Sequence, residues 1–87
     1  MTVSAGQMQG AGVYTRTGKS IGRISDLMID EKSGNVVYIV IASGGFLGIG
    51  ETRYSLPWAD IQFDQAKGNY IVSRLPQEMS SNILGVA

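Results

Sequence analysis

The sequence has 87 residues, with seven basic and seven acidic side chains, no cysteine and no histidine. The length allows one small domain, and the missing residue types exclude disulfides, thiolate metal sites and the most common general acid–base side chain. The balanced charges, spread without runs, disfavour direct binding to nucleic acid.

Membrane insertion and export are also disfavoured by the sequence. No apolar stretch approaches the length of about 20 residues that a membrane-spanning helix needs. Residues 1–10 have neither the basic nor the apolar region of a signal peptide. We therefore expect a cytoplasmic protein that is not an enzyme, has no cofactor and holds no metal.

The content of charged residues is low, at 16% against roughly 25% in an average soluble domain. With so few charges, part of the apolar surface is expected to be exposed, as in proteins that bind a partner or a second copy. The alternative is that glycines and short polar residues cover the surface instead. The composition leaves both open.

Three polar turns, each with a central glycine, precede apolar, β-branched runs. Their glycines are Gly18, Gly34 and Gly68. Such turns need positive φ angles and are typical of β-hairpins. The runs around them predict six strands, at residues 12–15, 20–30, 36–42, 52–56, 61–64 and 69–73. The third is apolar throughout, which indicates a central strand covered on both faces.

These strands favour an all-β fold, a small closed or partly open antiparallel β-barrel of about six short strands. Residues 57–60 predict one tight helical turn. A short C-terminal helix follows, where Leu75, Met79 and Ile83 form a stripe that plugs one barrel end or, alternatively, binds a partner helix. We expect a flexible N-terminal segment at 1–11, the barrel at 12–80 and a C-terminal tail at 81–87.

Four motifs in this order resemble the PRC-barrel family: residues 18–30, 34–40, 44–50 and 56–58. The family includes the cytoplasmic domain of the photosynthetic reaction centre H subunit and the C-terminal domain of a bacterial ribosome maturation factor. The resemblance covers residues 12–79 and is greatest to stand-alone bacterial members, because the membrane helix and the extra domain of those two proteins are not expected here. It implies a compact barrel that acts as a protein–protein adaptor without a cofactor.

The loop at residues 44–50 is the candidate interaction site. Its large apolar side chains are Phe46, Leu47 and Ile49, framed by Gly44, Gly45, Gly48 and Gly50. Phosphate binding is disfavoured, because no lysine and no helix follow these glycines. The loop either folds back to cap the barrel or forms an exposed apolar lip. Gly18, Gly22 and Gly34 are also expected to have structural roles.

Pro57 and Trp58 end a strand, where the indole is expected to close the barrel and not to stack on a ligand. Paired carboxylates can act as acid and base or bind calcium. The four that lie close enough in sequence for this are expected in turn and surface roles instead: Asp26, Asp30, Glu31 and Asp60. Ser25, Ser43 and Ser55 have no histidine to activate them.

Two functions from different classes are consistent with these features. The first is a non-enzymatic interaction module that self-associates, as a homodimer, and docks a protein partner that the sequence does not identify. The alternative is an accessory factor in ribosome assembly or RNA processing that acts through a ribosomal protein. A small-ligand site inside the barrel is less favoured, because side chains fill barrels with so few strands.

Overall fold

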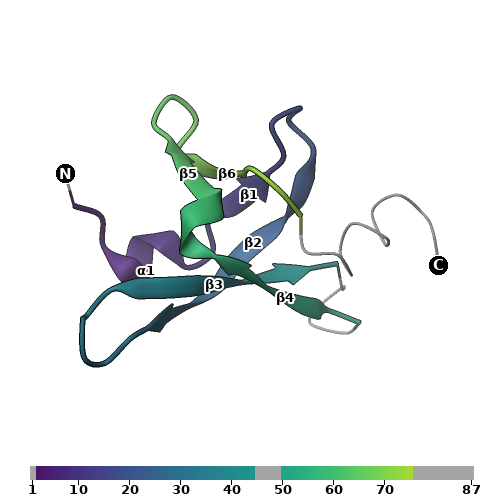
Figure 1. The fold of residues 1–87 in the computed structure, drawn as a ribbon. Coiled ribbons are helices and arrows are strands. Elements are labelled where there is room, and N and C mark those ends of the chain that lie inside the picture. Colours follow the sequence, from purple (N-terminus) through teal and green to yellow (C-terminus); the bar gives the residue numbers. More distant parts are fainter. Residues whose placement is uncertain (1, 45–49, 76–87) are drawn as a thin grey trace.

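The computed structural model describes residues 2–44 and 50–75, which form six strands and two short helical segments (Figure 1). The helical segments are α1 (Ala5–Met8) and the 3-10 helix η1 (Trp58–Asp60). The strands are β1 (Gly12–Tyr14), β2 (Ser20–Ile29), β3 (Val36–Ser43), β4 (Thr52–Pro57), β5 (Ile61–Asp64) and β6 (Asn69–Val72). Each strand differs from its predicted range by at most one residue at an end.

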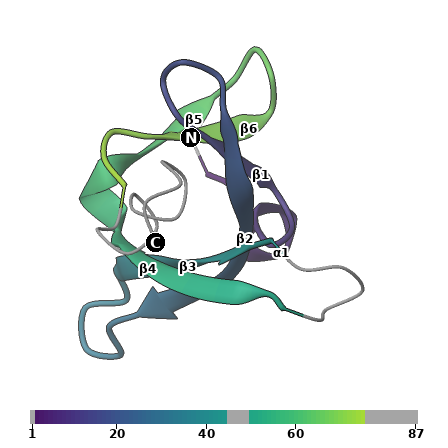
Figure 2. The same cartoon turned by 90° about the vertical axis from the view of Figure 1, so that its right-hand side faces the viewer.

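The strands form one sheet in the order β4-β3-β2-β1-β6-β5, which curls into a half-barrel (Figure 2). The predicted all-β barrel is confirmed, in its partly open form, with β4 and β5 as the edges. One strand pair departs from the antiparallel expectation, because β1 and β6 run parallel, with Val13 opposite Tyr70. Parallel strands need a long crossover connection, and here four strands separate β1 from β6 along the chain.

The predicted hairpin turns are confirmed by the backbone. The turn glycines Gly18, Gly34 and Gly68 have φ angles of 91°, 78° and 69°. Carboxylates close two of these turns. Asp30 accepts hydrogen bonds from the Lys32 amide and the Ser33 hydroxyl at 3.3 and 3.0 Å, and Asp64 accepts one from the Ala66 amide at 3.0 Å. The turns bring consecutive strands side by side, so local chemistry determines most of the sheet order.

The concave side of the sheet holds the hydrophobic core. Its buried members come from α1 and five strands: Met8, Val13, Ile21, Ile24, Ile39, Ile41, Tyr54, Leu56, Tyr70 and Val72. Leu75 packs against this cluster, as expected for the first residue of the predicted plug. Met79, Ile83, the rest of the predicted C-terminal helix and the tail at 81–87 lie outside the described residues.

The N-terminal segment, for which we expected flexibility at 1–11, includes helix α1, which packs onto the barrel. Met8 of α1 is only 3% exposed and belongs to the core. The Gly10 amide donates to the Ile24 carbonyl at 2.7 Å, and the Ile24 amide donates to the Ala11 carbonyl at 2.9 Å. These bonds extend the β1–β2 pairing toward the helix and fix Met8 over the core.

Strand β3 is central in the sheet but is not covered on both faces, contrary to the prediction. Ile39 and Ile41 are buried, whereas Tyr38 and Val40 are half-buried and Val37 is 51% exposed. The pattern follows from the architecture, because a single curled sheet covers its concave side only. No helix in the described part of the chain is long and apolar enough to cross a membrane.

Candidate interaction surfaces

The predicted interaction loop connects β3 to β4, and its central part lies outside the described residues. This applies to Phe46, Leu47 and Ile49, and to Gly45 and Gly48. At its base, Ser43 pairs with Thr52 across the strands, and Gly44 and Gly50 have φ angles of 72° and 78°. These positive φ angles favour glycine at both positions, while the structural role predicted for the loop glycines and the choice between a cap and a lip stay predictions.

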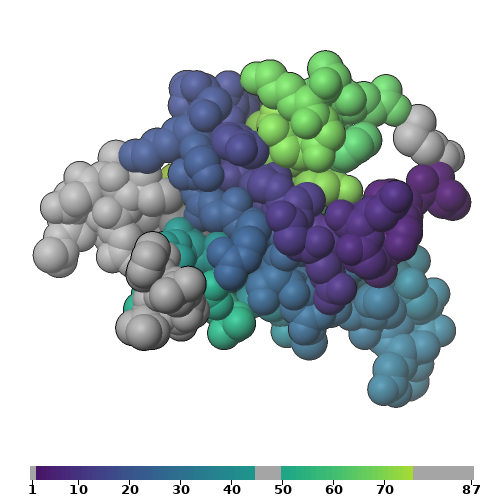
Figure 3. All heavy atoms as spheres, turned by 180° about the vertical axis from the view of Figure 1, so that it is seen from behind, coloured from purple at the N-terminus to yellow at the C-terminus, as the bar shows by residue number. Residues whose placement is uncertain are grey.

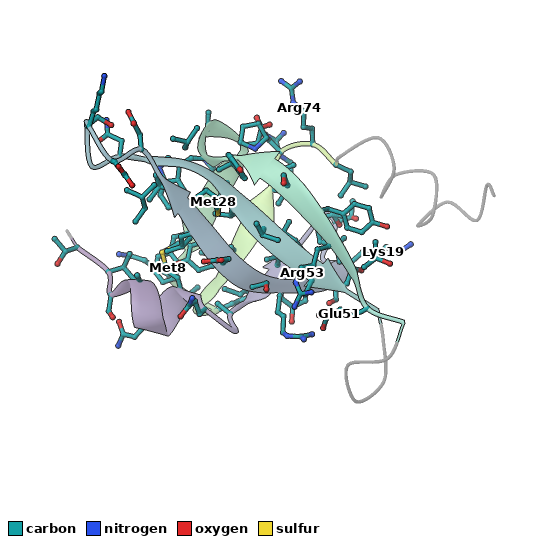
Figure 4. The ribbon with its side chains drawn as sticks, turned by 90° about the horizontal axis from the view of Figure 1, so that it is seen from below. Met8, Lys19, Met28, Glu51, Arg53 and Arg74 are labelled. Atoms are coloured by element: carbon teal, nitrogen blue, oxygen red, sulfur yellow. The ribbon has the colours of Figure 1, made fainter. Side chains whose placement is uncertain are left out.

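An ion-pair cluster lies beside this loop, on the convex face of the sheet. Glu51 pairs with Arg23 of β2, and its other carboxylate oxygen lies 3.1 Å from Arg53 of β4 (Figure 4). The two arginines stand on either side of Ala42 in the strand register, and Ala42 is 1% exposed. The cluster therefore links β2 and β4 across β3, at the register position of the buried Ala42.

Pro57 and Trp58 lie where the chain passes from one edge of the half-barrel to the other. Pro57 ends β4 opposite Tyr38, and η1 then leads directly into β5. The Ser73 amide, just after β6, donates to the Asp60 carbonyl at 2.9 Å, which ties this corner to the far part of the sheet. Trp58 is 38% exposed, so it covers the rim of the barrel and does not enter the core.

Several of the described polar side chains form ion pairs and hydrogen bonds within the fold. Asp60 pairs with Arg74 at 3.5 Å, and Asp26 accepts a hydrogen bond from the Leu27 amide at 2.8 Å. Ser25 accepts a hydrogen bond from the Arg53 side chain at 3.4 Å. Within residues 2–44 and 50–75, no three acidic side chains converge in a way that could hold a metal ion.

The clearest apolar surface lies at the outer end of the β2–β3 hairpin. Met28, Ile29 and Val37 are 38%, 54% and 51% exposed there. The hairpin stands away from the body of the molecule (Figure 3), so these side chains extend past the region that the core covers. We call these three residues the hairpin patch. The hairpin end then continues into the charged turn Asp30–Lys32.

A small groove lies between the β1–β2 turn and the β5–β6 turn, which stand side by side (Figure 2). Its volume is about 220 Å³, and its main lining residues are Tyr14, Arg16, Asp64, Lys67, Asn69 and Ile71. Sites for cofactors and drug-sized ligands usually measure about 300–1,000 Å³. The groove is therefore better suited to one side chain of another protein than to a whole small molecule.

The model of the PRC-barrel domain family matches residues 2–79. The chain belongs to the PRC-barrel family. The match spans the described residues and includes helix α1, which agrees with the place of Met8 in the core. A comparison with curated proteins found no match.

The composition left open whether apolar area would be exposed on this PRC barrel, and it did not locate the hairpin patch. Met28 and Ile29 precede a polar turn, which indicated a hairpin but not how far it would project. The groove was missed as well, because Arg16 and Lys67 are far apart in sequence and meet only through the pairing of β1 with β6. The parallel pair is the one feature of the sheet that local turn chemistry does not encode.

Proposed function

We propose that this PRC barrel is a protein–protein interaction module without enzymatic activity, which self-associates and docks a further protein. The observation that carries the proposal is the hairpin patch, because three large apolar side chains are exposed at the end of one hairpin. Covering such a patch is favourable by about 25 cal/mol for each Å² of apolar area removed from water.

The chemistry of the side chains supports the same proposal. Without histidine or cysteine, catalysis would depend on carboxylates, lysines or hydroxyls. Asp30, Asp60 and Glu51, however, take part in turn hydrogen bonds or ion pairs that stabilise the fold. Because these polar groups stabilise the barrel itself, we expect its function to lie in the surface that it presents to a partner.

The molar mass in solution tests the proposal directly. Light scattering on a sizing column, from micromolar to millimolar protein, should show a mass that rises above that of one chain. The double substitution Ile29→Thr/Val37→Thr should shift this rise to at least about tenfold higher concentration, since it removes apolar area while keeping β-branched side chains.

A matched control comes from Val3, which is 51% exposed like Val37 but lies before α1. Val3→Thr should leave the association unchanged. A wild-type protein that stays monomeric throughout would contradict self-association. An equal effect of Val3→Thr and the double substitution would contradict the assignment to the hairpin patch.

Three finer expectations stay predictions: the homodimer, the cytoplasmic location and the alternative role in ribosome assembly. The last has its own test, because it requires the protein to co-sediment with ribosomal particles or to bind a purified ribosomal protein. The hairpin variant should then lose that binding together with self-association if one surface serves both.

A further inference from the structure

The groove between the two turns carries a positive charge that the fold does not use. Arg16 and Lys67 line it, and within the described part of the chain neither cation has an ion-pair partner. Asp64 also lines the groove, but one of its oxygens accepts hydrogen bonds from the Ala66 and Lys67 amides at 3.0 and 3.4 Å. A carboxylate on a short, exposed segment is therefore complementary in charge and size to this groove.

Asn69 adds a polar group that is available inside the groove. It lines the groove, and its Oδ1 atom is buried without a hydrogen-bond donor among the described residues. Leaving such a buried acceptor unsatisfied is unfavourable. Because Oδ1 of Asn69 accepts no hydrogen bond here, a docked segment can donate one to it without breaking an existing bond at this atom.

The opposite end of the molecule presents a matching segment. The turn between β2 and β3 contains Asp30, Glu31 and Lys32, and lies on the far side from the groove (Figures 1 and 3). Both carboxylate oxygens of Asp30 accept hydrogen bonds within this turn. Glu31 is exposed, and the described residues offer it no partner. Glu31 is therefore the carboxylate that remains available.

We propose that the Glu31 turn of one molecule docks in the groove of a second copy of this chain, an inference that rests on the proposed self-association. Glu31 pairs with Arg16 and Lys67 of the second copy, and Lys32 faces its Asp64. Ile29 of the hairpin patch directly precedes the turn, and the patch is covered in the same contact.

This contact joins two different surfaces, so it is head-to-tail and not two-fold symmetric. Two molecules joined in this way leave one groove and one turn free, and further copies add until a ring closes or a filament grows. Charge complementarity of this kind weakens as salt screens it, with a Debye length of about 10 Å at 0.1 M and about 3 Å at 1 M.

Charge-reversed variants in a mixing experiment test the proposal. The groove variant is Arg16→Glu/Lys67→Glu and the turn variant is Glu31→Lys, all at exposed positions. Each alone should raise the dissociation constant at least about tenfold. Mixed at equal concentration, the two should associate again, because the intact turn of the groove variant meets the intact groove of the turn variant, and the two reversed surfaces also carry opposite charges.

The control Asp26→Lys makes the same charge change at an exposed site of β2 outside the turn, and it should associate like the wild type. Circular dichroism confirms that each variant is folded. If the mixture stays monomeric, or if both variants associate like the wild type, the head-to-tail contact is overturned while self-association stands. If the wild type is monomeric at every concentration, self-association itself fails.

Discussion

Gly22 of β2 lies so close to Ala42 of β3 that a Cβ atom on Gly22 would be 2.3 Å from the Ala42 carbonyl oxygen. Its φ angle of 145° is one that other residues rarely adopt. Gly22 directly precedes Arg23, which pairs with Ala42 where the ion-pair cluster crosses the sheet. Close approach of the backbones at this point therefore helps to set the curl of the half-barrel.

Gly22→Ala is expected to lower the free energy of unfolding by about 3 kcal/mol. The added methyl group would collide with backbone atoms, which cannot move aside as a side chain can, and the φ angle adds strain. Urea unfolding followed by circular dichroism measures the loss.

Gly68→Ala is the matched control for this prediction. Gly68 also has a positive φ angle, but no atom lies within 4 Å of the site where its Cβ would be. The substitution should cost about 1–2 kcal/mol, the penalty of the conformation alone. Equal losses at the two positions would show that the contact with Ala42 is not decisive.

Glu51→Gln is expected to destabilise the barrel by about 1 kcal/mol, since it removes the negative charge shared by Arg23 and Arg53 while keeping the shape of the side chain. The Glu51 side chain is 10% exposed, so its pairs are less hydrated than ordinary surface pairs. The difference between variant and wild type should shrink in about 1 M salt. A difference that does not change with salt would rule out the charge as its cause.

Local patterns in the sequence predict the strands and turns of this barrel well. Glycine turns such as the one at Gly34 and the β-branched run that begins at Val36 determine their own conformations, because turn chemistry and strand propensity act over a few residues. The sequence could predict that position 22 needs a glycine, but it could not predict that Ala42 of the neighbouring strand lies against it.

Features that depend on distant residues could not be predicted in the same way. Glu51 and Arg23 are separated by 28 positions, and the groove forms only because β6 returns beside β1. The sequence does not predict the burial of Met8, since a helix of four residues has no detectable amphipathic pattern. Met8 is buried because α1 covers a part of the core that the strands leave open.

Met8→Ala is expected to cost about 2–4 kcal/mol, because it removes a side chain that is 3% exposed and packs in the core. Gln7→Ala changes the exposed neighbour in the same helix and should have little effect. Thermal unfolding of both variants separates them. Equal stability of Met8→Ala and wild type would show that α1 does not contribute to the folded barrel.

Tyr70 is expected to make the barrel sensitive to alkaline pH. It lies in the core, and burial raises the pKa of its hydroxyl above the ordinary value of 10.0. The unfolded chain therefore releases this proton first as the pH rises. The stability due to the neutral hydroxyl is complete below pH 10 and is lost as the pH rises through the raised pKa.

Tyr70→Phe tests this prediction, because it removes the titrating group and keeps the ring, whose centroid lies 5.1 Å from that of Phe63. At pH 7 the variant should unfold at a urea concentration close to that of the wild type. Above pH 10 the wild type should lose stability more steeply than the variant, since only the wild type gains from ionising this phenol on unfolding. Parallel losses in the two proteins would assign the alkaline sensitivity to other groups.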